Sequence, residues 1–209
     1  MLGYGITECS PIVSVNASLN GRRAADETVG WTFPSVEVKI DQPDYTGSGE
    51  VLVRGDNVMM GYYNDPYSTA DVFTDGWFRT GDLGHLNKDG SLTITGRKKN
   101  LIILSNGENV SPEEIEYQLA RIPEIKEVVV YTEGNLIVAE IFPEENEMTD
   151  ADLKAVLQER INDYNAHQPS HKRVNKVKIR KNEFEKTTTH KIKRYKVLEK
   201  SKKEQEKES

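Results

Sequence analysis

The sequence predicts an α+β fold in two parts: a β-rich, barrel-like subdomain followed by a small mixed α/β C-terminal domain. Two patterns support this prediction. Short alternating segments separated by Gly, Pro and Asp fill residues 36–95, as is typical of half-buried strands. After Gly96 the pattern changes to apolar runs that alternate with amphipathic helical stretches. A chain of 209 residues is long enough to form such cores without disulfides or structural metals.

The first part should contain at least two hairpins. Residues 36–40 and 50–54 alternate apolar and polar side chains, which indicates strands with one buried face. Asp89-Gly90 lies between two further strand-like segments, and this dipeptide favours a tight hairpin because both residues tolerate positive φ. The Gly-rich segment 46–49 has no following helix or lysine, so it is interpreted as a turn and not as a phosphate-binding loop.

The second part should begin with a buried strand at residues 101–104 and then a helix. Ser111 is the expected N-cap, Pro112 suits the first turn, and Glu114 would complete a capping box. Residues 128–131 and 136–139 should form a hairpin through Gly134-Asn135. A second helix should begin at Thr149, and residues 176–180 should form the last strand. The expected buried face of that second helix consists of Leu153, Val156, Leu157, Ile161 and Tyr164.

These elements divide the chain into four segments. Residues 1–95 form the β-rich subdomain, residues 96–100 a hinge, and residues 101–197 the small C-terminal domain. Residues 198–209 are a charged tail without apolar periodicity, for which we expect disorder.

The charge distribution is uneven. The net charge is −6, yet residues 166–209 carry 15 Lys/Arg against 6 Asp/Glu, a net charge of +9, so the remainder carries −15. A basic end favours a polyanionic partner, which could be a nucleotide, nucleic acid or a membrane surface in peripheral contact. No apolar run reaches the roughly 20 residues of a membrane span. Because Cys9 is the only cysteine and no secretory signal is visible, the expected location is cytoplasmic.

Four motifs follow one another in an informative order. They are residues 3–8 (GYGITE), residues 77–82 (WFRTGD), residues 96–100 with 107–112 (GRKKN and GENVSP), and residues 186–194 (KTTTHKIKR). This order resembles the adenylate-forming superfamily of acyl-CoA synthetases, luciferases and peptide-synthetase adenylation domains. The resemblance covers nearly the whole chain. It implies a two-step ligase that makes an acyl-AMP from a carboxylic acid and ATP and then transfers the acyl group to coenzyme A.

The resemblance implies roles for residues in the first part. The ring of Tyr4 would pack on adenine, Thr7 would donate to phosphate, and Glu8 would hold Mg²⁺, which prefers oxygen ligands. Asp82 would accept hydrogen bonds from the ribose hydroxyls. Arg97 would reach the ribose or phosphate through its planar, permanently charged guanidinium.

It also implies roles around the hinge and in the second part. Lys99 matches the position about which the small domain swings, and Lys there favours the long-chain fatty acyl branch. Gly107 resembles a position beside the pantetheine tunnel, where a missing side chain allows close approach. Lys191 is the expected catalytic lysine of the first half-reaction. His190 replaces the glycine that commonly precedes this lysine, and His tolerates positive φ better than most residues.

The family's phosphate loop and acyl-binding pocket are not visible in this sequence. We therefore expect a truncated piece of an ATP- and Mg²⁺-dependent fatty acid–CoA ligase, inactive in isolation. Acyl carrier protein is an alternative acceptor, and a non-catalytic nucleotide-binding module is an alternative function. A nucleic-acid partner is disfavoured, because only Phe184 and Tyr195 are available to stack bases beside the lysines.

Overall fold

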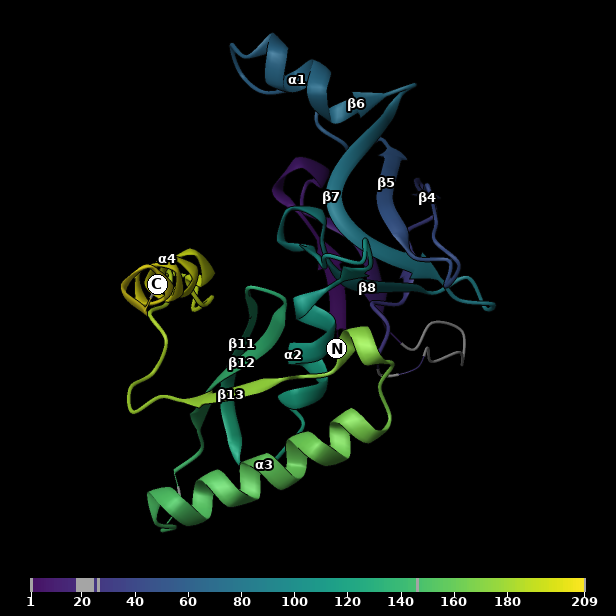
Figure 1. Ribbon diagram of the computed structural model, residues 1–209. Helices are drawn as coiled ribbons and strands as arrows, with labels where there is room; N and C mark the ends of the chain where they lie inside the picture. Colours follow the sequence, from purple (N-terminus) through teal and green to yellow (C-terminus); the bar gives the residue numbers. More distant parts are fainter. Residues whose placement is uncertain (1, 18–24, 26, 146, 209) are drawn as a thin grey trace. The chain divides into compact units, whose positions relative to one another are not determined.

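The computed structural model describes residues 2–17, 25, 27–145 and 147–208 (Figure 1). The chain forms two compact units, Met1–Lys99 and Asn100–Ser209. The boundary between them falls within the predicted hinge segment, residues 96–100. No helix of the described residues is long and apolar enough to cross a membrane.

The described residues of the first unit form two sheets. One has the order β1-β2-β3, formed by Leu2–Gly5, Ile12–Asn16 and Trp31–Thr32. The other has the order β4-β5-β7-β6, and β8 also pairs with β7. Its strands are Val36–Asp41, Gly49–Gly55, Phe73–Thr74, Trp77–Leu86 and Leu92–Arg97, taken in chain order from β4 to β8. The short helices are η1 (Thr7–Cys9) and α1 (Pro66–Val72).

The two sheets of the first unit share one core. Buried Val13 of β2 packs in the same cluster as Val51 and Val53 of β5 and Phe78 of β7. The predicted strands at 36–40 and 50–54 and the turn at 46–49 are confirmed. The hairpin at Asp89-Gly90 is also confirmed, with Gly90 at φ 82°. The barrel-like expectation needs correction, because the sheets of the described residues stay open.

The core of the second unit is a three-stranded sheet with helices on both faces. The sheet has the order β11-β12-β13, where β11 and β12 are antiparallel and β12 and β13 are parallel. The strands are Ile125–Glu133, Leu136–Pro143 and Lys176–Ile179. The helices are α2 (Pro112–Leu119), α3 (Asp150–Ala166), η3 (Ser170–Lys172) and α4 (Arg194–Glu208). η2 (Lys98–Asn100) spans the unit boundary, and β9 (Ile102–Ile103) pairs antiparallel with β10 (Asn109–Val110) as a separate two-stranded sheet.

Successive apolar side chains of β11 point to opposite faces of the sheet, which explains why helices cover both faces. Val128 and Val130 pack with the apolar stripes of α2 and α3, whereas Val129 and Tyr131 pack with Phe184 and with Val197 of α4. Side chains of adjacent strand residues point to opposite faces, so an apolar run needs cover on both sides. The α+β class predicted from the sequence is therefore confirmed.

Most local predictions in the second unit agree with the structure. Gly134 adopts φ 58° in the hairpin between β11 and β12. Thr149 caps α3 by accepting a hydrogen bond from the Asp152 amide. The buried face of α3 consists of Leu153, Leu157 and Ile161, with Tyr164 packed beside the core.

Two local predictions in this unit are wrong in detail. The strand expected at residues 101–104 shrinks to two residues, and Ile103 is 74% exposed. The capping box also does not form. The Ser111 hydroxyl contacts Glu113 and makes no cap to a backbone amide. Acidic side chains near the helix N-terminus still favour the helix through its dipole.

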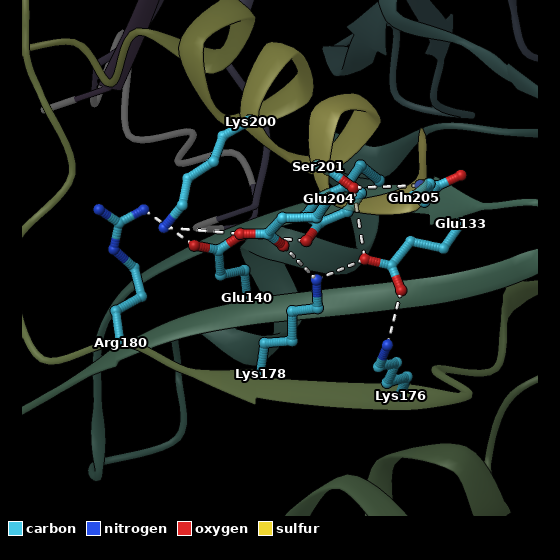
Figure 2. A network of polar contacts seen from close by, with 10 residues as sticks. Glu133, Glu140, Lys176, Lys178, Arg180, Lys200, Ser201, Glu204 and Gln205 are labelled. Carbon is cyan, nitrogen blue, oxygen red and sulfur yellow. Dashed lines mark hydrogen bonds and ion pairs between the residues drawn. The ribbon is translucent and has the colours of Figure 1, made fainter. Parts of the chain in front are cut away.

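Helix α4 lies where a disordered tail was expected. Among the described side chains of this helix, Val197 alone joins the apolar cluster on the sheet, and the other contacts with the sheet named here are polar. Glu133 accepts from Lys176 at 2.7 Å and from Ser201 at 3.3 Å, while Lys178 bridges Glu133 and Glu204 (Figure 2). An apolar pattern search cannot detect such a helix, because ion pairs with the sheet replace the apolar stripe.

Candidate functional site

Three of the predicted nucleotide-binding residues meet in the first unit. The Tyr4 hydroxyl donates to Oδ2 of Asp82 at 2.7 Å. Nε of Arg97 contacts Oδ1 of the same carboxylate, also at 2.7 Å. Asp82 thus holds one partner on each carboxylate oxygen. We call Tyr4, Asp82 and Arg97 the Asp82 cluster.

The strand register explains how these residues meet. Asp82 in β7 lies directly opposite Arg97 in β8, and side chains at paired antiparallel positions are close neighbours. The preceding residue, Gly81, has φ 68°, a left-handed conformation that favours glycine. The Thr80 hydroxyl accepts from the Asp82 amide at 3.0 Å and donates to the carbonyl of Val51 at 2.7 Å. Local backbone and side-chain bonds therefore fix the carboxylate.

Burial sets the electrostatics of the Asp82 cluster. The Asp82 side chain is only 5% exposed, whereas that of Arg97 is 47% exposed. Part of the Arg97 guanidinium is therefore accessible to a ligand. Burial of Tyr4, with a further contribution from the Asp82 charge, raises the pKa of the phenol well above its ordinary value of 10.0. Tyr4 consequently remains a hydrogen-bond donor at neutral pH.

Thr7 and Glu8 lie in η1, directly after β1. Thr7 is exposed and Glu8 is half-buried. The Tyr62 hydroxyl donates to Oε1 of Glu8 at 3.1 Å, and the Met59 amide donates to the Glu8 carbonyl at 2.8 Å. A partly exposed carboxylate suits Mg²⁺, which commonly binds one or two protein carboxylates together with phosphate oxygens and water. Glu8 therefore fits the metal role that the resemblance implies.

Neighbouring Cys9 is a free, buried thiol. Burial, with a contribution from Glu8, raises its pKa to about 11. The thiol is therefore protonated at neutral pH and is a poor nucleophile.

The remaining predicted residues lie at the unit boundary and in the second unit. Lys99 is exposed in η2, and Gly107 is a turn residue with φ 82°. Lys191 lies on the loop before α4. This loop is closed by an antiparallel bridge between Lys186 and Ile192. The structure therefore groups Tyr4, Thr7, Glu8, Asp82 and Arg97 in one unit and places Gly107 and Lys191 in the other.

The loop backbone presents Lys191 to solvent. The Thr187 amide donates to the Lys191 carbonyl at 2.8 Å, and the Lys191 amide donates to the Thr187 hydroxyl at 3.2 Å. His190 has φ 60°, so its expected left-handed conformation is confirmed. Within the described part of the chain, the exposed Lys191 ammonium has no ion-pair partner and is available to a negatively charged ligand.

Sequence reasoning missed two residues that hold the site together. Thr80 lies inside the WFRTGD motif, only two residues before Asp82, and this closeness in sequence was a usable signal. Tyr62 lies 54 residues from Glu8. No local pattern could have joined those two residues, because their contact depends on how the strands pack.

Comparison with known proteins identifies the family. The AMP-binding enzyme family matches residues 1–63, and the AMP-binding enzyme C-terminal domain family matches residues 99–207. Indoleacetate–CoA ligase of Aromatoleum aromaticum is 42% identical over 71% of this chain and 31% of the relative. Long-chain-fatty-acid–CoA ligase of Escherichia coli O157:H7 is 40% identical over 60% of this chain and 23% of the relative. The chain thus spans less than a third of the length of these curated relatives.

Solved structures show the same fold. The amide bond synthetase McbA of Marinactinospora thermotolerans matches 94% of this chain and 41% of its own, with a TM-score of 0.73 and 28% identity. ATP-bound MatB of Rhodopseudomonas palustris matches 95% of this chain and 40% of its own, with a TM-score of 0.77 and 26% identity. The C-terminal domain family matches more than half of the residues of this chain. The chain therefore belongs to the AMP-binding, adenylate-forming enzyme family that includes the acyl- and aryl-CoA ligases.

Proposed function

We propose that this chain is the C-terminal part of an ATP-dependent ligase that joins a carboxylic acid, specifically a fatty acid, to coenzyme A through an acyl-AMP. The observation that carries the proposal is the Asp82 cluster, in which a buried carboxylate and a half-exposed guanidinium are held side by side. Relatives named long-chain-fatty-acid–CoA ligase support the choice of acid.

In the first half-reaction, the enzyme must stabilise the negative charge on the phosphate oxygens. A carboxylate oxygen attacks the α-phosphorus, the bond to the bridging oxygen breaks, and pyrophosphate leaves. Asp82 would accept hydrogen bonds from the ribose hydroxyls after exchanging some of its present partners for them. Arg97 and the Lys191 ammonium would stabilise the charge that develops on the phosphate oxygens, and Thr7 would donate to the same group. Mg²⁺ held at Glu8 would neutralise phosphate charge.

The second half-reaction transfers the acyl group. The thiol sulfur attacks the acyl carbon, the bond to the AMP oxygen breaks, and the thiol proton leaves with a base. Gly107 has open space around its Cα, which suits a position beside a passing pantetheine arm. Lys99, exposed at the unit boundary, is the proposed hinge between the two catalytic orientations.

Replacement of Lys191 by Ala tests the catalytic assignment. The assay uses a full-length ligase, in which this chain is preceded by the region that the longer relatives have in addition. In that enzyme, Lys191→Ala should slow acyl-AMP formation roughly 10²-fold or more, because a charge that stabilises the transition state is lost. Thioester formation from supplied acyl-AMP should stay within about twofold, and Lys193→Ala on the same loop is the matched control. Equal losses in both half-reactions would contradict the assignment.

The acceptor and the isolated chain need separate measurements. Supplying either coenzyme A or acyl carrier protein to that enzyme decides which thiol is used. The isolated chain has no phosphate loop in its sequence, so calorimetry should find ATP binding weaker than micromolar. Micromolar affinity would instead favour a stand-alone nucleotide-binding module. A cytoplasmic location belongs to the same proposal and agrees with the free thiol of Cys9.

A further inference from the structure

The loop that carries Lys191 is anchored on both sides. On its N-terminal side, Lys186 forms ion pairs with Glu127 of β11 and with Glu183. On its C-terminal side lies Arg194, three residues after Lys191 and the first residue of α4. The Lys193 amide donates to the Glu185 carbonyl at 2.7 Å and closes the stem of the loop. The position of Lys191 therefore depends on how these two sides are held.

Arg194 reaches from the loop to the open edge of the sheet. β11 is an edge strand, because the sheet order is β11-β12-β13. Nη1 of Arg194 donates to the carbonyl oxygen of Val130 at 2.9 Å, and Nη2 contacts Oε2 of Glu116 in α2. Oε1 of Glu116 in turn accepts from the Val130 amide at 2.5 Å. Two side chains thus satisfy both polar backbone groups of an edge residue that has a neighbouring strand, β12, on one side only.

This arrangement joins three elements at one point: α2 through Glu116, the sheet through Val130, and the Lys191 loop through Arg194. The Arg194 and Glu116 side chains are 20% and 15% exposed. Burial raises the pKa of the Glu116 carboxyl, and the Arg194 charge opposes that rise. Each residue therefore depends on the other, because either charge would be poorly solvated alone.

The other ion pair on this side of the loop is different. Lys196 pairs with Glu185, and these side chains are 42% and 60% exposed. Exposed ion pairs contribute little to folding stability, because water and salt screen the attraction between their charges. Their spacing along the chain is also local, so they tie the loop only to itself. Lys196 provides a matched control for Arg194, since both are cations within six residues of Lys191.

We propose that Arg194, paired with Glu116 across the open edge of β11, is a positioning residue that holds the Lys191 loop in the geometry needed for acyl-AMP formation. The role in catalysis rests on the proposed function. The ordering of the loop does not, and it can be measured on the chain alone. Arg194 acts through the backbone of the loop and through α4, and it is not assigned any contact with substrate.

Amide hydrogen exchange on the 209-residue chain tests the structural half of this proposal. The reporters are the amides of Thr187, Lys191 and Lys193, each bonded within the loop. Arg194→Gln should speed their exchange roughly tenfold or more, since a buried, charge-assisted anchor is lost. Lys196→Gln should leave them within about twofold. The amide of Ile141 in β12, far from the anchor in sequence, should change little in either variant.

A conservative variant separates positioning from general destabilisation. Arg194→Lys keeps the charge but cannot donate in two fixed directions at once, so it should give an intermediate rate at the loop amides. If Arg194→Gln unfolds the whole unit, Arg194→Lys and Glu116→Gln supply the same comparison. Loop amides that exchange at the wild-type rate, or that accelerate only in step with Ile141, would overturn the proposal.

The catalytic half is read in the complete ligase. Arg194→Gln should slow acyl-AMP formation about tenfold while leaving the KM for ATP and the second half-reaction within about twofold, and Arg194→Lys should recover part of the loss. Unchanged acyl-AMP formation in Arg194→Gln would refute the positioning role. If Lys191→Ala also has no effect, the proposed function itself fails, even where the exchange data still show that Arg194 orders the loop.

Discussion

The Asp82 cluster predicts an asymmetric response to loss of its two charges. In Arg97→Gln, the carboxylate of Asp82 remains 95% buried with Tyr4 as its donor but without a cation, because its side chain is only 5% exposed. In Asp82→Asn, the Arg97 guanidinium, 47% exposed, can be hydrated by water. Loss of the carboxylate should therefore be tolerated better than loss of the cation.

The magnitudes follow from the contacts. Asp82 accepts from Tyr4 and Arg97 with one oxygen each, whereas Asn has one acceptor oxygen and an NH2 group that only donates. Asp82→Asn therefore loses one hydrogen bond and weakens the other, a loss of about 2 kcal/mol before screening and about 1–2 kcal/mol once the exposure of Arg97 is considered. Arg97→Gln leaves a buried, uncompensated charge and should cost about 2–3 kcal/mol. With a denaturant slope of roughly 1–2 kcal/mol/M, the urea midpoints should fall by about 1 M and about 2 M respectively.

Tryptophan fluorescence is a selective assay for this effect. The chain has two tryptophans, Trp31 and Trp77, and both belong to the first unit. Urea unfolding followed at their emission should show the two shifts in the stated order. Leu157→Ala, a cavity in the core of the second unit, should leave this transition unchanged while it weakens the helical signal. A more stable Arg97→Gln protein, or a larger loss in Asp82→Asn, would refute the reasoning.

The stability of the protein should depend on pH through two groups whose pKa values are shifted. Burial, followed by the Asp82 charge, raises the pKa of Tyr4. The protonated phenol therefore contributes fully to stability below the ordinary pKa of 10.0, and this contribution is lost as pH rises above it. In urea unfolding, the free-energy difference between wild type and Tyr4→Phe should shrink by about 1.4 kcal/mol per pH unit beyond pH 10. Burial opposes ionisation of Glu133, but hydrogen bonds from Lys176 and Lys178 outweigh it and lower its pKa. Its contribution is therefore present above the ordinary value of 4.5 and lost as pH falls, so Glu133→Gln should flatten the acid loss of amide protection in α4 between about pH 5 and 3. A pH-independent difference in either series would contradict the corresponding contact.

Local features of the fold were readable from the sequence because they depend on near neighbours. Thr149 as a cap, Gly134 in a hairpin and the stripe of Leu153, Leu157 and Ile161 each reflect spacing within one element or one turn. The ordered motifs also named the residues of the candidate site, because the resemblance carries information that periodicity does not.

Helix α4 shows what such a reading cannot detect. Its residues have almost no apolar face, so a search for hydrophobic periodicity predicts a solvated tail. Ser201 and Glu204 instead find partners on the sheet that lie 68 and 26 residues away in the chain. Ion pairs between elements leave no periodic trace, because either partner alone is indistinguishable from an ordinary surface residue.

By itself, the sequence determined the α+β class, the order of most strands and helices along the chain, and the residue types available for nucleotide chemistry. Only the tertiary structure decided that Tyr4 meets Asp82 and that Arg194 meets Glu116, pairs separated by 78 residues in each case. It also decided that β11 lies at the edge of its sheet. The physical reason is that period and spacing reflect local backbone geometry, whereas such contacts depend on strand order and register across the whole unit.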